Sequence, residues 1–135
     1  MPKNRKMKIT KNFDLSEFAC NDGTPVPEIL LPNVTELANN LQVIRDALGK
    51  PVHINSGYRT VDYNKKIGGV SNSQHVIAKA ADITVSGLTP KEVHAVIEGL
   101  IAQGKVRQGG LGLYDTFVHY DVRGTKARWD FRKHK

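Results

Sequence analysis

The sequence predicts one mixed α+β domain: a small, mostly antiparallel sheet with two long helices packed on one face and the other face left for chemistry. Three observations predict it. Residues 33–48 and 89–101 repeat apolar side chains at helical spacing. Shorter segments alternate apolar and polar residues with the period of two that is typical of half-buried strands. The chain of 135 residues is also long enough for a single hydrophobic core.

Both long helices carry signals at their ends. We expect Asn33 to cap the first helix, with Glu36 completing a capping box. Gly49 then follows the last apolar position and is expected to end this helix. In the second helix, Thr89 is the expected cap, and Glu92 reaches back to it from three residues further on.

The alternating segments predict strands that gather polar side chains on one face of the sheet. Asp82 points away from its apolar neighbours, and in a later strand His119 and Asp121 share the polar face. If these two strands are neighbours, Asp82 and His119 lie on the same side of one sheet, where His75 can fold over them. We expect strands at residues 51–55, 81–85, 109–114 and 117–122, and a short helix at 60–67.

We expect the packed domain to cover residues 13–130, between a flexible basic lead-in (1–12) and a basic tail (131–135). No apolar run approaches the roughly 18 residues that a membrane span needs. The basic N-terminus is not followed by a long apolar stretch, so we expect no secretory signal peptide. We therefore expect the protein to be made in the cytoplasm, and either to act there or to reach the cell wall by phage-type release. We expect a monomer.

The chain is basic, with a formal net charge of +7 and a pI near 9.6. This charge predicts attraction to polyanions, which include nucleic acids and anionic cell-wall polymers. Much of the excess lies at the two ends with few aromatic residues, so we expect no specific nucleic-acid partner. Cys20 is the single cysteine, which excludes an intramolecular disulfide and a Cys-rich zinc site.

His75, Asp82 and His119 are candidate metal ligands. Two imidazoles and one carboxylate suit a zinc ion that keeps a fourth position open for water. Zinc lowers the pKa of bound water to about 7, which makes hydroxide available for attack on an amide carbonyl. The spacing alone leaves other interpretations open: a surface histidine in a loop, a carboxylate that caps a turn, and a hydrogen-bonded, half-buried imidazole.

Five spaced segments strengthen the metal hypothesis. They are FACNDG at 18–23, NSGYRT at 55–60, GGVSNSQH at 68–75, AADI at 80–83 and VHYDVRG at 118–124. In this order they resemble the zinc D-Ala-D-Ala carboxypeptidase family, peptidoglycan peptidases with the LAS (hedgehog-like) metallopeptidase fold. The resemblance is to small bacterial and phage members and runs from about Phe13 to Trp129.

The resemblance implies a zinc enzyme that hydrolyses amide bonds in peptidoglycan stem peptides, as a carboxypeptidase or an endolysin-like endopeptidase. His75, Asp82 and His119 match its three zinc ligands. Arg59 matches an arginine that steadies the substrate and the developing oxyanion, a role that suits a permanently charged guanidinium.

Two further residues of the motifs are candidate substrate contacts. Ser73 matches a serine that hydrogen-bonds the substrate, although capping the loop around His75 is an equal alternative. Tyr58 stands beside the arginine of the motif, where packing is the alternative to substrate contact.

The chain departs from the family pattern at two points. Ala78 stands where related enzymes often have glycine, which matters only if the backbone there needs a positive φ. Thr116 and Phe117 stand where relatives place the catalytic base. Asp121 and Asp115 are the candidate bases that remain. Asp121 has two alternatives: it orients a ligand histidine, or it pairs with a neighbouring arginine.

The missing base motivates an alternative function, in which a non-catalytic module keeps the fold and binds cell-wall peptide or another protein. A second alternative is a basic nucleic-acid binder that uses the two ends of the chain.

Overall fold

The computed structural model of the chain describes residues 7–133. The predicted lead-in and tail therefore lie partly outside the described residues. Within them, Lys8 forms an isolated antiparallel bridge with Asp14, and Leu15 N donates to Met7 O at 2.7 Å. The described part of the lead-in is thus hydrogen-bonded to the start of the domain.

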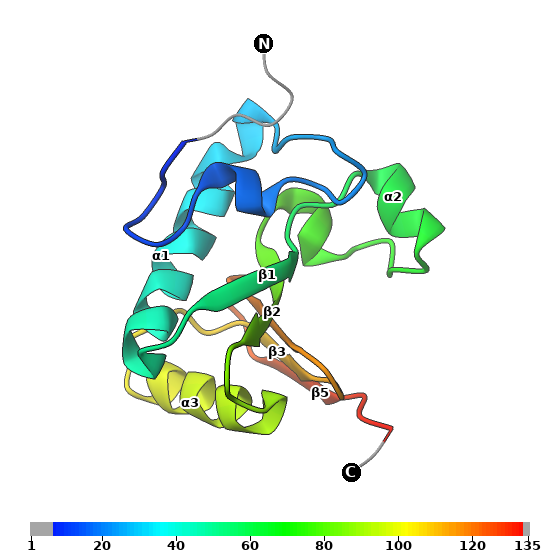
Figure 1. The fold of residues 1–135 in the computed structure, drawn as a ribbon. Coiled ribbons are helices and arrows are strands. Elements are labelled where there is room, and N and C mark those ends of the chain that lie inside the picture. Colours follow the sequence, from blue (N-terminus) through cyan, green and yellow to red (C-terminus); the bar gives the residue numbers. More distant parts are fainter. Residues whose placement is uncertain (1–6, 134–135) are drawn as a thin grey trace.

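A five-stranded sheet forms the centre of the fold (Figure 1). Its strands, in spatial order, are β1 (Val52–Ser56), β2 (Ala80–Val85), β4 (Val118–Asp121), β3 (Gly110–Leu113) and β5 (Ala127–Asp130). All neighbours are antiparallel except β3 and β5, which are parallel. The predicted small, mostly antiparallel sheet is therefore confirmed.

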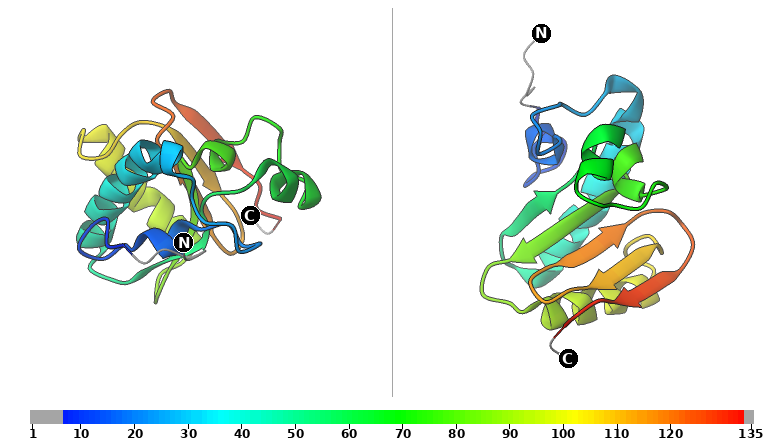
Figure 2. Two further views of the ribbon diagram at one scale, coloured as in Figure 1. Left: turned by 90° about the horizontal axis from the view of Figure 1, so that it is seen from above. Right: turned by 90° about the vertical axis from the view of Figure 1, so that its right-hand side faces the viewer.

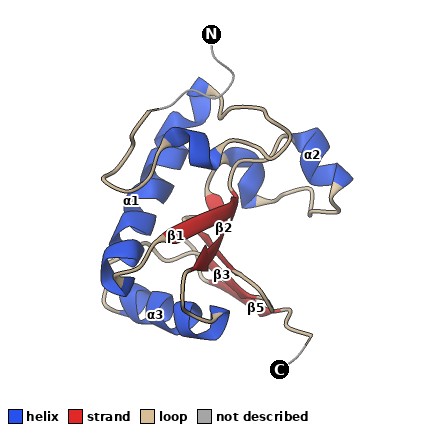
Figure 3. Ribbon diagram, viewed as in Figure 1, coloured by secondary structure: helices blue, strands red, loops and turns tan. Residues whose placement is uncertain are grey.

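Two long helices, α1 (Leu31–Leu48) and α3 (Pro90–Ala102), lie on one face of the sheet and contact each other. The right-hand view of Figure 2 shows them behind the strands, and Figure 3 shows α2 (Val61–Lys66) at the opposite side of the molecule. Short 3-10 helices complete the fold: η1 (Leu15–Phe18), η2 (Glu28–Leu30) and η3 (Gln74–Ile77). None of the helices in residues 7–133 is long and apolar enough to cross a membrane.

The core lies between these helices and the sheet. Its fully buried side chains include Val34, Leu37, Ala38, Leu41 and Ile44 of α1, Val93 and Ile97 of α3, and Ile83, Leu111, Val118 and Tyr120 of the sheet. The apolar stripe of each helix thus faces the sheet, as its periodicity predicts. Burial of the stripes on one face leaves the polar positions of β2 and β4 on the other.

The start of α1 differs from the prediction. The helix begins at Leu31, directly after η2, and its cap residue Leu30 makes no side-chain hydrogen bond. A proline is tolerated in the first turn because its missing N–H has no helical partner there, so the helix starts before Asn33. Asn33 Nδ2 instead donates to Ile77 O at 2.9 Å, and Glu36 pairs with Arg107.

The other predicted ends are confirmed. Thr89 and Glu92 form a capping box at the start of α3, and Gly49 ends α1 with a φ of 66°. The short helix predicted at residues 60–67 is present as α2, and Thr60, its first predicted residue, is the cap that accepts a hydrogen bond from Tyr63 N.

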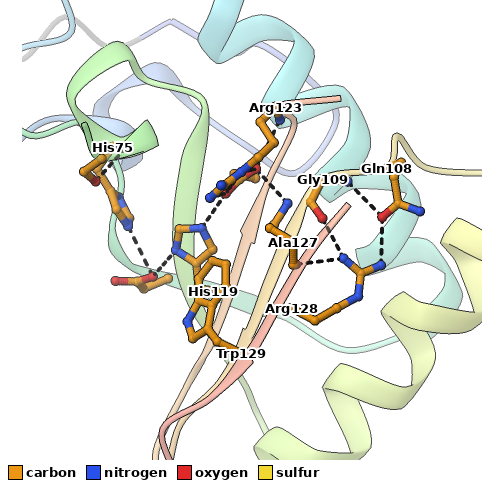
Figure 4. Close-up of polar contacts among 12 residues, drawn as sticks. His75, Gln108, Gly109, His119, Arg123, Ala127, Arg128 and Trp129 are labelled. Atoms are coloured by element: carbon orange, nitrogen blue, oxygen red, sulfur yellow. Dashed lines mark hydrogen bonds and ion pairs between the residues drawn. The ribbon is translucent and has the colours of Figure 1, made fainter. Parts of the chain in front are cut away.

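Strand β5 was not predicted from the sequence. It lies at the sheet edge, where Arg128 attaches it to α3 and to the loop before β3. The Arg128 guanidinium binds both carboxylate oxygens of Glu98, at 2.9 and 3.0 Å, and donates to Gly109 O at 2.6 Å. Figure 4 shows part of this network. It gives the C-terminal segment a fixed place beside β3.

The strand register sets one row of residues across the whole sheet. In the order of the strands, the row is Ser56, Asp82, His119, Gly112 and Trp129. Residues paired in this way point to the same face. Asp82 and His119 are therefore directly opposite each other, as their predicted face and neighbouring strands require.

Candidate metal centre

Three buried side chains converge on the sheet face that the helices leave open. Asp82 Oδ1 lies 3.3 Å from His75 Nε2 and 3.2 Å from His119 Nδ1. The candidate ligand atoms of the three residues all lie within 4.8 Å of one another. Figure 4 labels His75 and His119 and marks these two contacts with dashed lines. The structure thus brings together the three predicted metal ligands.

Each ligand comes from a different element. Asp82 is fixed by β2 and His119 by β4, at paired positions. His75 lies in η3, whose first turn is closed by Ser73: the Ser73 hydroxyl accepts a hydrogen bond from His75 N at 3.1 Å. The Ser73 cap therefore fixes the start of η3, the short helix that carries His75 over the sheet.

The outward nitrogen of each imidazole has an acceptor. His75 Nδ1 lies 2.8 Å from Gly57 O, and His119 Nε2 lies 2.7 Å from Asp121 Oδ2. Carbonyl and carboxylate oxygens accept hydrogen bonds, so both outward nitrogens carry hydrogen. In the neutral rings, His75 Nε2 and His119 Nδ1 then present lone pairs toward Asp82. Two lone pairs and a carboxylate repel one another unless a proton or a metal cation lies between them, and two imidazole nitrogens with one carboxylate are a donor set that fits a zinc-type metal ion.

Asp121 is completely buried behind His119. Its carboxylate accepts hydrogen bonds from Gly110 N at 2.8 Å and from Arg123 Nε at 2.9 Å, besides the contact with His119. Glycines make room for it: a Cβ at Gly109 would lie 1.9 Å from Asp121 O, and one at Gly110 would lie 2.2 Å from Asp121 Oδ2. Asp121 thus lies in a closely fitting space directly behind His119, one of the candidate metal ligands.

The electrostatics of the centre follow from these contacts. Burial alone raises the pKa of Asp121, but hydrogen bonds from His119, Arg123 and Gly110 outweigh it and hold that pKa well below its usual range. Burial likewise raises the pKa of Asp82, and the two imidazoles more than reverse this. The pKa of His119 is raised, because the two carboxylates outweigh the effect of burial. Both carboxylates are therefore ionised at neutral pH.

Arg59 flanks the centre on the β1 side. Its guanidinium donates to Asp82 Oδ2 at 3.2 Å, to Ser56 Oγ at 3.1 Å and to Asn64 Oδ1 at 3.2 Å. Asn64 is buried in α2 and is itself held by Val70 O, to which its Nδ2 donates at 2.8 Å. Nothing in the sequence pattern singles out Asn64, which acts only through contacts that the fold creates.

A cleft of about 500 Å³ opens over the three ligands. One wall is the segment from residue 67 to residue 74, and the other is aromatic and formed by Tyr114, Phe117, Trp129 and Phe131. The Trp129 ring centroid lies 4.9 Å from that of His119, and Trp129 Nε1 donates to the Tyr114 hydroxyl at 2.9 Å. Neither Tyr114 nor Trp129 was predicted as a site residue. The alternation of residues 127–130 is a sequence signal for strand β5, but it does not indicate that Trp129 lies in the cleft.

The remaining candidates are distributed differently. Ser73 lines the cleft as well as capping η3, so its position is compatible with both predicted roles. Tyr58 is half-buried, packs against the hydrophobic core and is not among the residues that line the cleft. Asp115 is exposed in the turn before β4, where it accepts a hydrogen bond from Lys133 N at 3.0 Å, and it does not line the cleft either.

The backbone at Ala78 has a positive φ, so the alanine that stands here in place of glycine affects the local conformation. It ends η3 in the left-handed region, with a φ of 59° and a ψ of 33°. No other non-glycine residue in the described part of the chain has a positive φ. Alanine is strained in this conformation by about 1 kcal/mol, whereas glycine adopts it freely.

The chain is similar in sequence to known peptidases. The family model described as peptidase M15 matches residues 11–121. The peptidoglycan L,D-endopeptidase MepK of Escherichia coli K12 is 30% identical over 102 residues, which cover 69% of this chain and 52% of that protein. The zinc D-Ala-D-Ala carboxypeptidase of Streptomyces albus G is 48% identical over 44 residues, 32% of this chain and 17% of that protein. The chain thus spans about half of the first relative and less of the second. Because the family match covers most of its residues, the chain belongs to the peptidase M15 family.

Proposed function

We propose that the protein is a zinc-dependent peptidase that hydrolyses amide bonds in peptidoglycan stem peptides. The observation that carries this proposal is the convergence of His75 Nε2, His119 Nδ1 and the Asp82 carboxylate, with both outward nitrogens bonded to acceptors. The family and the names of the two relatives support the substrate class.

The residues around the centre have separate tasks in this proposal. When bound, zinc supplies Lewis acidity that activates water and polarises a carbonyl group. Arg59, fixed by Ser56 and Asn64, holds the substrate and stabilises the oxygen on which negative charge develops. The Ser73 hydroxyl lines the cleft and has a hydrogen to donate to the substrate backbone, because its oxygen only accepts from His75 N.

We propose that Asp121 is a positioning residue and not the proton acceptor of the reaction. Its oxygens already accept from His119, Arg123 and Gly110, and it is completely buried. Asp82 is the only carboxylate among the described residues that line the cleft, and Arg59 pairs with it. The orientation that Asp121 gives to His119 keeps Nδ1 free of hydrogen and directed at the metal position.

The test is the release of fragments from purified sacculi by the zinc-loaded protein at neutral pH. We expect soluble peptide fragments from the wild type and none from His75→Ala or after chelation. Release of D-alanine alone identifies a carboxypeptidase, and release of larger peptides identifies an endopeptidase. A zinc-loaded wild type that releases neither contradicts the proposal.

A second candidate function is a non-catalytic module that binds cell-wall peptide. The observation that favours it is the absence of a second carboxylate from the described lining of the cleft. Retention of zinc-loaded protein on sacculi without any fragment release would support this module. Salt-sensitive DNA binding that survives chelation would support the nucleic-acid binder predicted from the charge.

The narrower proposal is an endolysin-like enzyme that acts as a monomer on the cell wall. The net charge of +7 favours approach to an anionic wall. Addition of the zinc-loaded protein to cells with a permeabilised outer membrane should clear the suspension, and light scattering of the pure protein should give about one chain mass. Cells that stay turbid while isolated sacculi are cut would contradict the endolysin-like role alone.

A further inference from the structure

Tyr114 continues strand β3 on the open face of the sheet. Its backbone N donates to Phe117 O at 3.1 Å, which extends the antiparallel pairing with β4. It lies two residues after Gly112 and so shares its face. The ring stacks on Phe117 with centroids 4.2 Å apart and meets Phe131 edge-on at 5.8 Å. The aromatic neighbours therefore fix the direction of the phenol.

The Tyr114 hydroxyl is held by one partner and keeps its own hydrogen. Trp129 Nε1, which only donates, contributes a hydrogen bond to the phenol oxygen at 2.9 Å. Among the residues that the structure describes, none accepts a hydrogen bond from this hydroxyl. Gly112 provides the space in which the two groups meet, because a Cβ there would lie 2.1 Å from Trp129 Nε1. The O–H is thus oriented by the indole and available to a ligand in the cleft.

The position of Tyr114 mirrors that of Arg59. Arg59 follows strand β1 in the chain, and Tyr114 follows strand β3. In the sheet, strands β2 and β4, which carry the Asp82 and His119 ligands, lie between β1 and β3. All four residues line the same cleft. Burial raises the pKa of Tyr114. The negative charge of Asp82 raises this pKa further, and the positive charge of Arg59 lowers it without reversing the shift. The hydroxyl therefore stays protonated at neutral pH and acts as a donor.

We propose that Tyr114 is a catalytic residue that donates a hydrogen bond to the scissile carbonyl oxygen as negative charge develops there, from the side of the centre opposite Arg59. The O–H bond is not broken, so the step needs no further reactant. This inference rests on the proposed peptidase function. It adds a second donor to a centre whose sequence pattern indicates only Arg59.

The test is Tyr114→Phe, compared with wild type at saturating zinc. Loss of one preorganised donor to an oxyanion lowers kcat by about 100- to 1,000-fold. We expect the KM and the zinc affinity to stay within threefold, because the hydrogen-bond partner of the phenol is Trp129 and none of the three proposed zinc ligands. The half-buried Trp129 N–H can be hydrated in the variant, so folding is preserved. A phosphinate analogue of the scissile dipeptide imitates the transition state. Its affinity for Tyr114→Phe, measured by calorimetry, should fall relative to wild type by about the same factor as kcat.

Tyr120→Phe is the matched control. Its hydroxyl donates to Arg107 O at 2.7 Å on the helix-covered face, so its loss should lower stability and leave kcat unchanged. A kcat of Tyr114→Phe within threefold of wild type, or a loss of kcat that follows loss of zinc, overturns the inference while the peptidase function stands. A zinc-loaded wild type that cuts no bond overturns both.

Discussion

Asp121→Asn separates the two roles that this carboxylate can have. In the wild type Asp121 offers acceptors only, and these receive hydrogens from His119, Gly110 and Arg123. An asparagine amide has one acceptor oxygen and one NH₂ group, so a donor must face a donor on one side. If the NH₂ faces His119, the imidazole changes tautomer and places a hydrogen on Nδ1, the atom directed at the metal.

The expected magnitude follows from these contacts. Loss of a group that orients a ligand histidine lowers metal affinity by about 10- to 100-fold, or about 1.4–2.7 kcal/mol. The metal-free protein should also lose about 1.5–3 kcal/mol of unfolding free energy, because hydrogen bonds to a buried charge are broken. Chelator competition at pH 7 measures the first quantity and urea unfolding the second.

A catalytic base would behave in the opposite way. Its loss lowers kcat by about 100- to 10,000-fold at saturating zinc and leaves zinc affinity unchanged. That result for Asp121→Asn would refute the positioning role. Asp115→Asn is the matched control for zinc affinity, which it should not change, because Asp115 lies in an exposed turn. A collapse of kcat in this control would identify Asp115 as the base.

Four further variants, at three positions, test other parts of the structure. Gly112→Ala should displace the Trp129 indole, because the new Cβ would lie 2.1 Å from Trp129 Nε1. The kcat on sacculi should then fall at least tenfold. An unchanged kcat would contradict the inference that activity needs the aromatic side chains of the cleft held in place. Ala78→Gly should change the unfolding free energy by less than about 1 kcal/mol, because relief of left-handed strain is offset by greater freedom of the unfolded chain and a lost methyl group. Ala78→Val should lower it by about 2 kcal/mol or more in the same urea titration, and equal stability of the two variants would refute the strain. Arg128 lowers the pKa of Glu98, so this pair stabilises the fold above the ordinary glutamate pKa of about 4.3 and loses that effect as pH falls below it. Glu98→Gln should remove about 0.5 kcal/mol of unfolding free energy at pH 7 and progressively less as the pH falls below about 4.3, and an equal loss at pH 7 and pH 3 would exclude the ion pair as the cause.

Periodicity in the sequence was sufficient to predict the elements whose buried residues recur at regular spacing. The stripe of α1, the box at Thr89 and the shared face of Asp82 and His119 all follow from local spacing. Asn33 was misassigned because its local pattern resembles a cap, whereas the η2 turn before it already starts the helix and the tertiary contact with Ile77 takes its side chain.

The aromatic wall could not be predicted by the same reasoning. Strand β5 is four residues long and pairs in parallel with β3, so its place depends on Arg128 and its contacts with α3. Trp129 joins the cleft only because the residue opposite it in β3 is Gly112. Asn64 is a similar case, because it positions Arg59 from a short helix with no apolar periodicity. Such roles arise from long-range pairing, which single-sequence patterns do not encode.

Anomalous diffraction at the zinc edge, from crystals of the zinc-loaded protein, tests the central claim most directly. We predict one strong peak at about 2.0–2.2 Å from His75 Nε2, His119 Nδ1 and an oxygen of Asp82. A peak beside His119 Nε2, or a zinc-loaded crystal with no peak between these three side chains, would contradict the proposed metal centre and the hydrolysis derived from it.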